Sequence, residues 1–233
     1  EVATEPPVGA REQLRRLAFD ARPRPGTWIR ACAVDAAATR PDLLADGEKA
    51  ALLADADALV RETALARFGS GAGAATLPVV DRVRVLRSAG LFREIDDEVL
   101  SELAPRLGEV RVEDGRPVPA DGETGRAMYV VADGTVRLET AGEAPALLGP
   151  GRTFGELAAL EADGAPDAAT ALEPSLLLRL PGDDLRDFLS TRIEAVRGII
   201  GVLCSRARSA SAGQQGRAPA AERRPAAADQ ASA

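Results

Sequence analysis

The chain changes its hydrophobic period near Gly108. Before this point apolar residues recur every three or four positions, which is typical of helices with one buried face. From Gly108 onward apolar and polar residues alternate over short runs, which is typical of half-buried strands. We therefore predict helices at 11–20, 28–38, 47–54, 59–68 and 77–89, and then strands at 109–113, 116–119, 127–132, 134–140, 145–148, 168–172 and 175–180.

Capping and turn residues support this division. Thr27 is placed to cap the second helix, and Asp96 to cap a further helix ahead of the strands. Asp133 and Gly134 both tolerate positive φ, which predicts a hairpin. Helices follow the strands from Gly182 and again from Thr191. Many short strands at regular spacing predict a barrel or jelly roll. The expected fold class is α+β: an N-terminal all-α segment, then a β-barrel or jelly roll with flanking helices.

Gly- and Ala-rich runs divide the chain into three expected units. Residues 69–75 predict a flexible hinge. The chain after residue 208 is rich in Ala, Pro and Arg without an apolar period, which predicts disorder. The expected units are a helical segment at 1–73, a mixed domain at 74–208 and a disordered tail at 209–233.

The composition narrows the functions that we expect. The net charge is −7, which argues against nucleic acid as a partner. The chain has no histidine, which excludes histidine acid–base catalysis and histidine metal ligation. Cys32 and Cys204 are expected to be buried free thiols, as in a reducing cytosol. No apolar run reaches the length of about 18–20 residues that crosses a bilayer, so we expect a cytoplasmic protein.

The most specific motif lies between residues 149 and 172. It predicts a glycine turn, a short helix, a loop and a strand. A helix this short needs a surrounding frame, and its unpaired backbone N–H groups would then face an anion. The motif resembles the phosphate-binding cassette of the cyclic nucleotide-binding domain family, and the resemblance extends over about residues 85–208. The matching positions are Phe154, Gly155, Glu156, Leu157 and Ala158, followed by Asp167, Ala168, Ala169 and Thr170.

The resemblance implies roles for some of these residues. Gly155 and its neighbours would offer N–H groups to the cyclic phosphate of cAMP or cGMP, and Glu156 would accept from the ribose 2′-hydroxyl. Where the family has a phosphate-binding arginine, this chain has Asp167. Losing a charged hydrogen bond costs about 1.5–3 kcal/mol, and a carboxylate about 6 Å from the phosphate adds roughly 3 kcal/mol of repulsion. We therefore expect affinity to fall on the order of 10³-fold or more, unless Arg126 or Arg152 substitutes.

The N-terminal helices carry a second resemblance. The segments at 28–34 and 59–65 align, and aspartates precede the second one. This resembles the HEAT repeat pattern, in which an arginine binds the aspartate of the preceding turn; an ordinary alanine-rich bundle is the alternative. The order of HEAT-like helices, connector and cyclic nucleotide-binding domain also resembles the soluble C-terminal region of bacterial nucleotide carriers and major facilitator transporters. Because the chain starts at Glu1, a cut from such a protein, lying at the cytoplasmic face of the membrane, is one hypothesis.

Two functions remain open from the sequence. The first is a regulatory module with weakened or lost cyclic nucleotide binding, which couples to a partner or to an attached transporter domain. The second is a ligand-free protein–protein interaction module. We do not expect an enzyme, a cofactor or a metal site. A DNA-binding regulator is disfavoured because no helix-turn-helix pattern follows residue 208. The last helix either packs on the strands or forms the seam of a homo-oligomer.

Overall fold

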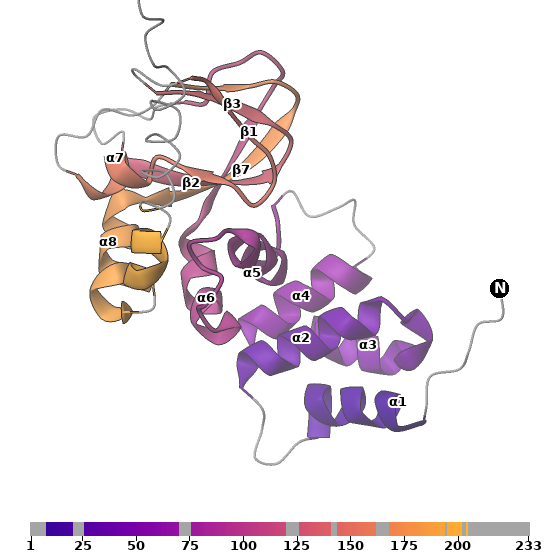
Figure 1. Ribbon diagram of the computed structural model, residues 1–233. Helices are drawn as coiled ribbons and strands as arrows, with labels where there is room; N and C mark the ends of the chain where they lie inside the picture. Colours follow the sequence, from indigo (N-terminus) through magenta and orange to yellow (C-terminus); the bar gives the residue numbers. More distant parts are fainter. Residues whose placement is uncertain are drawn as a thin grey trace, which may run out of the picture.

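The computed structural model describes residues 8–20, 26–69, 76–119, 126–140, 144–161, 168–193, 195–201 and 204. Figure 1 shows a group of helices from the N-terminal third of the chain and, apart from it, two antiparallel sheets. Helices α5 (Val79–Ser88) and α6 (Asp97–Leu103) lie between these two parts. The change of hydrophobic period therefore marks a change of architecture, as predicted.

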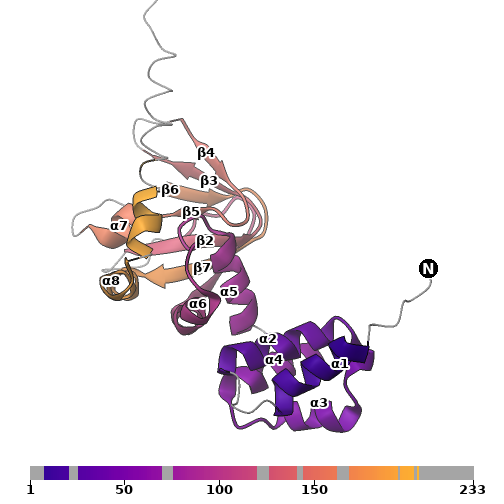
Figure 2. The ribbon, with the colours of Figure 1, turned by 60° about the horizontal axis from the view of Figure 1, so that its bottom comes forward.

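The N-terminal part has a small core of alanine, valine and leucine. Val34, Leu52, Val60 and Ala64 are fully covered there. These short side chains let neighbouring helices approach closely, and α2 and α4 lie side by side (Figures 1 and 2). The elements are α1 (Val8–Arg15), the π-helix η1 (Arg16–Asp20), α2 (Thr27–Ala38), the 3-10 helix η2 (Pro41–Leu43), α3 (Asp46–Leu53) and α4 (Ala58–Phe68). The predicted helices are confirmed, but the first one is divided into α1 and η1.

One carboxylate joins the starts of α2 and α4. Asp57 is the N-cap of α4 and accepts hydrogen bonds from two backbone N–H groups of its first turn. The hydroxyl of Thr27 donates to the same carboxylate over 2.5 Å. The expected cap of α2 by Thr27 is therefore wrong: Gly26 holds that position, and Thr27 is the first helical residue. Asp96 does hold the N-cap position of α6, but its side chain makes no capping hydrogen bond.

The aligned arginines of α2 and α4 both bind the turn between α3 and α4. Arg30 is 8% exposed, pairs with Asp55 and donates to the carbonyl oxygen of Ala18 at 3.2 Å. Arg61 donates to the backbone carbonyl oxygens of Asp55 and Ala56. The aspartate is thus bound by the arginine of the earlier helix, and the later arginine binds backbone. These contacts do not establish a HEAT repeat, which stays a prediction.

An ion-pair network attaches α5 to the N-terminal helices. Asp35 of α2 pairs with Arg67 of α4 at 2.7 Å and with Arg84 of α5. Asp81 of α5 pairs with the same two arginines at 2.6 and 2.8 Å. The side chain of Asp35 is only 7% exposed, and two guanidinium partners offset the cost of burying its charge.

The segment from α5 to the 3-10 helix η3 (Ala104–Arg106) packs under the sheets. Leu91 and Phe92 lie in the turn between α5 and α6 and are almost fully covered. The Phe92 ring meets Phe188 edge-on, with ring centroids 6.3 Å apart. Arg82 of α5 pairs with Glu109 at 3.3 Å, at the start of the strands. Helices and sheets are therefore joined by both apolar and ionic contacts.

The strands form two antiparallel sheets. Their bounds are β1 (Gly108–Val112), β2 (Ala127–Asp133), β3 (Val136–Glu139), β4 (Ala146–Leu148), β5 (Thr153–Phe154), β6 (Ala168–Ala171) and β7 (Ser175–Pro181). The four-stranded sheet has the order β1-β7-β2-β5, and the three-stranded sheet has the order β4-β3-β6. An apolar cluster with Val131, Val136, Ala171 and Leu177 at its centre takes side chains from both sheets. Helices α7 (Glu156–Leu160) and α8 (Gly182–Thr191) lie along one side (Figure 2).

Three expectations about this part need correction. Of the expected barrel or jelly roll, a closed barrel is not found: the described strands pair as two separate antiparallel sheets, which is a jelly-roll-like arrangement. The strand expected at 116–119 is reduced to a single bridge between Pro117 and Thr170, which is flanked by hydrogen bonds from the N–H of Val118 to Ala169 and from the N–H of Ala171 to Arg116. Thr191 ends α8 instead of beginning a helix, and helical residues resume at 193 and 195–201 after a break at Arg192.

Other expectations are corrected or lie outside the described residues. The thiols are not both buried: Cys32 is half-buried and Cys204 is exposed, and both are free. Most of the expected hinge, residues 70–75, and the whole tail at 209–233 lie outside the described part of the chain. Among the described helices, none is both long and apolar enough to cross a bilayer.

Candidate functional site

The cassette begins with a backbone turn that only glycine fits. Gly155 has a φ of +79° and is the N-cap of α7. A Cβ at this position would lie 2.5 Å from the carbonyl oxygen of Ala127 in β2. The start of α7 therefore lies directly against the backbone of β2, and a larger residue would separate them.

The strand before this glycine is fixed by an aromatic pair. Phe154 of β5 is opposite Tyr129 of β2, and their rings are stacked with centroids 5.0 Å apart. The Tyr129 hydroxyl donates to the carbonyl oxygen of Pro119 at 3.0 Å. Phe154 is 3% exposed, so it serves the core between the sheets. Within the predicted cassette, Phe154 therefore holds β5 against the core.

Glu156 is the buried charged residue of the cassette. It is the first residue of α7 and is 1% exposed. Its carboxylate accepts a hydrogen bond from the hydroxyl of Thr153. Ala158 is also buried, whereas Leu157 is 45% exposed and points away from the core. A buried carboxylate at the start of this helix is suited to accept a hydroxyl hydrogen bond, which is the role that the resemblance implies.

The second half of the cassette belongs to the other sheet. Ala168, Ala169 and Thr170 lie in β6, which pairs with β3. Ala169 and Phe154 belong to one apolar cluster, so the structure brings the two halves of the motif to a common core. Asp167 lies outside the described residues.

Residues 109–192 match the model of the family described as "Cyclic nucleotide-binding domain". This match contains the glycine turn, the buried glutamate and both halves of the cassette. Residues 109–192 form a cyclic nucleotide-binding domain. The helices before it and the residues after it lie outside the match.

Known proteins resemble the chain over this domain and its flanks. The chain is 27% identical over 131 residues to the "CRP-like cAMP-activated global transcriptional regulator" of Mycobacterium tuberculosis, with 53% of this chain and 58% of the relative covered. It is 38% identical over 100 residues to the "Cyclic AMP receptor protein" of Thermus thermophilus, covering 41% and 44%. It is 33% identical over 101 residues to the "cAMP-dependent protein kinase regulatory subunit" of Yarrowia lipolytica, covering 42% and 26%. The matches span little more than half of the relatives at most.

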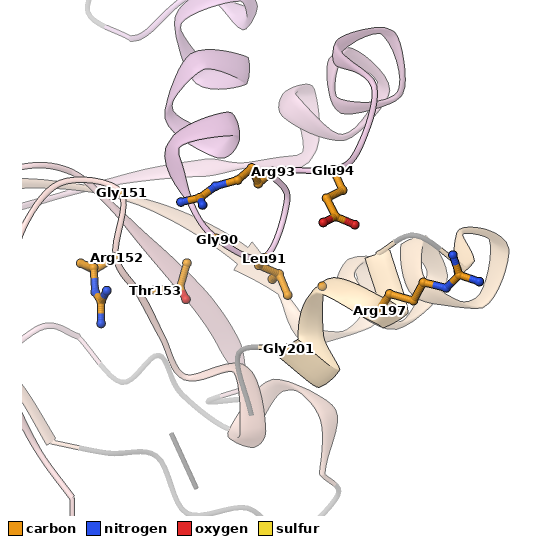
Figure 3. Close-up of a pocket in the computed structure, with 10 residues that line it drawn as sticks. Gly90, Leu91, Arg93, Glu94, Gly151, Arg152, Thr153, Arg197 and Gly201 are labelled. Carbon is orange, nitrogen blue, oxygen red and sulfur yellow. The ribbon is translucent and has the colours of Figure 1, made fainter. Parts of the chain in front are cut away.

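A hollow of about 390 Å³ lies where the cyclic nucleotide-binding domain meets its flanking helices. Figure 3 shows its three walls: the turn after α5 with Arg93 and Glu94, the end of the turn before β5 with Arg152 and the first residue of β5, Thr153, and the C-terminal helical residues Arg197 and Gly201. None of the eight predicted cassette residues that the structure describes lines it. Since its walls come from segments about 60 and 45 residues apart, local motifs gave no signal for it.

The hollow and the cassette share a boundary at Thr153. Its side chain lines the hollow, and its hydroxyl donates to the carboxylate of Glu156. Arg152, which we considered as a substitute for the missing arginine, has an exposed side chain at the hollow. Arg126, the other candidate, precedes β2, and its carbonyl oxygen accepts from the N–H of Gly182 at 2.8 Å.

Proposed function

We propose that the cyclic nucleotide-binding domain of this chain is a regulatory module whose affinity for cAMP or cGMP is weakened by Asp167. The observation that carries the proposal is the buried carboxylate of Glu156, held at the start of α7 by a glycine turn within the family match. This framework suits a ribose hydroxyl. The aspartate in the place of the phosphate-binding arginine opposes the cyclic phosphate.

We further propose that the module acts through a partner protein or an attached domain, and not as an enzyme. The relatives that share the domain include a transcriptional regulator and a kinase regulatory subunit, so the same domain serves different effectors. In this chain Arg67 of α4 pairs with Asp35 of α2 and with Asp81 of α5. These ion pairs support a role for the N-terminal helices in responding to changes in the cyclic nucleotide-binding domain. HEAT-like partner binding, attachment to a transporter and a cytoplasmic location belong to this proposal.

A ligand-free interaction module is the second candidate. One observation favours it: the carboxylate of Glu156 is closed to solvent and bonded to Thr153 within the chain. In this alternative the cassette is kept as a packing element of the fold. Restoring the arginine would then not create a binding site.

The experiment is a calorimetric titration of the whole chain with cAMP and cGMP. Three proteins are compared: the unaltered chain, Asp167→Arg, and Glu12→Arg as a control. Glu12 is exposed on α1, and this control changes the net charge by the same two units far from the cassette. Removing the repulsion and adding the pair should raise affinity on the order of 10³-fold, whereas the control should behave as the unaltered chain.

The outcomes separate the two functions. Millimolar binding by the unaltered chain and micromolar binding by Asp167→Arg support the weakened regulatory module. Micromolar binding by the unaltered chain, with less than about tenfold gain in the variant, would contradict the role of Asp167. No binding by any of the three proteins would favour the ligand-free module.

A further inference from the structure

Two glycines at the border of the hollow make close contacts with the segment that ends α5 and follows it. Gly151 has a φ of +77°, and a Cβ there would lie 2.8 Å from the hydroxyl oxygen of Ser88 at the end of α5. A Cβ at Gly198 would overlap the carbonyl oxygen of Leu91. The glycine at 151 therefore lets the domain lie directly against the end of α5, and the glycine at 198 lets the C-terminal helical residues lie against the turn that follows α5.

Two other glycines leave the space open. A Cβ at Gly90 or Gly201 would meet no atom within 4 Å, although both residues line the hollow. The resulting volume of about 390 Å³ is within the range of small-molecule sites, roughly 300–1,000 Å³. The hollow therefore has room for a ligand. A larger side chain at Gly201 can fill it without a clash at Cβ.

The charges around the hollow are mainly positive. Among the described residues, Arg93, Arg152 and Arg197 line it, together with one carboxylate, Glu94. In Figure 3 the Arg93 side chain extends toward the turn at Gly151, whereas Arg152 and Arg197 extend to opposite edges. Within the described part of the chain, none of these three guanidinium groups forms an ion pair or hydrogen bond, although many of the other arginines pair with carboxylates.

We propose that this hollow is a second ligand site, which binds a small organic phosphate carrying at least two negative charges. In the described lining, three guanidinium groups against one carboxylate leave a local excess of positive charge on a chain whose net charge is −7. Guanidinium groups bind phosphate oxygens through paired hydrogen bonds, and their long stems can turn inward around a ligand. The site is distinct from the cassette, because the cassette residues that the structure describes, Phe154–Ala158 and Ala168–Thr170, lie outside its lining.

Thr153 connects the proposed site to the cassette. A phosphate that accepts a hydrogen bond from Thr153 would compete with the carboxylate of Glu156 for the same hydroxyl. Occupancy of the hollow would therefore change the partner of the buried glutamate.

The test is a calorimetric titration of the whole chain with pyrophosphate, in the absence of cyclic nucleotide. Arg93→Gln and Arg152→Gln should each weaken binding by about tenfold or more. Gly201→Leu should weaken binding at least as much by filling the hollow while leaving every charge in place. Arg16→Gln, at an exposed arginine of η1 in the N-terminal helices, is the control and should bind as the unaltered chain does.

Each other outcome overturns the proposal. Absence of saturable pyrophosphate binding by the unaltered chain refutes the site. Equal weakening by Arg16→Gln and Arg93→Gln means that phosphate binds the surface non-specifically. Unchanged binding by Gly201→Leu, in a protein with an unaltered circular dichroism spectrum, places the anion outside the hollow.

Discussion

Replacing Gly155 by alanine tests how closely α7 lies against β2. Alanine at a φ of +79° costs about 1–2 kcal/mol in any left-handed position. Its Cβ would also lie 2.5 Å from the carbonyl oxygen of Ala127, where ordinary contacts begin near 3.4 Å. Relieving this overlap requires the helix or the strand to shift, and such overpacking costs about 1–3 kcal/mol. We therefore expect Gly155→Ala to lower the free energy of unfolding by about 2–5 kcal/mol in total.

Gly115 provides the matched control. It has a similar φ of +70°, but a Cβ there would meet no atom within 4 Å. Gly115→Ala should therefore cost only the backbone part, about 1–2 kcal/mol. The assay is urea unfolding followed by circular dichroism for the two variants and the unaltered chain. Equal losses for Gly155→Ala and Gly115→Ala would refute the close approach of α7 to β2.

Three further predictions concern the helical part and the thiols. Asp35→Ala removes a buried partner of Arg67 and should lower the free energy of unfolding in urea by about 1.5–3 kcal/mol, and an unchanged midpoint would contradict the network. Burial acts to raise the pKa of Asp57, but the hydrogen bonds that it accepts outweigh burial and lower the pKa. The carboxylate therefore contributes its full stabilisation above about pH 4, and this contribution is lost as the pH falls through the lowered pKa of the folded protein. Asp57→Asn should make the loss of stability in acid less steep, and an equally steep loss would contradict the role of Asp57 as a cap. Burial, aided by nearby carboxylates, raises the pKa of the Cys32 thiol, so iodoacetamide should label exposed Cys204 first in a mass-spectrometric time course; equal rates would show that burial does not protect Cys32.

The sequence predicted what depends on short-range patterns. The change of period near Gly108 located the boundary between helices and strands, because the two structures bury side chains at different intervals. Gly155 was recognised from its motif, and the structure adds the reason, which is its contact with the backbone of Ala127. Such features are local in the chain and can be read one segment at a time.

The features that the sequence missed depend on distant partners. Thr27 has the right chemistry for a cap, yet its hydroxyl binds Asp57, which lies 30 residues away. The hollow needs three segments that no motif relates, and the pairing of strands into two sheets likewise depends on long-range contacts. Cys204 is exposed and Cys32 is half-buried because different faces of their helices are packed. In an alanine-rich helix the sequence does not show which face is packed.

The most direct test of the proposed function adds a second substitution to the restored cassette. Cyclic AMP is titrated into Asp167→Arg and into the double variant Asp167→Arg/Glu156→Gln. If the restored arginine acts in the cassette, the loss of the charged acceptor at Glu156 should weaken binding about tenfold. Equal affinity of the single and double variants would mean that cAMP binds elsewhere, and would contradict the assignment of this cassette as a weakened cyclic nucleotide site.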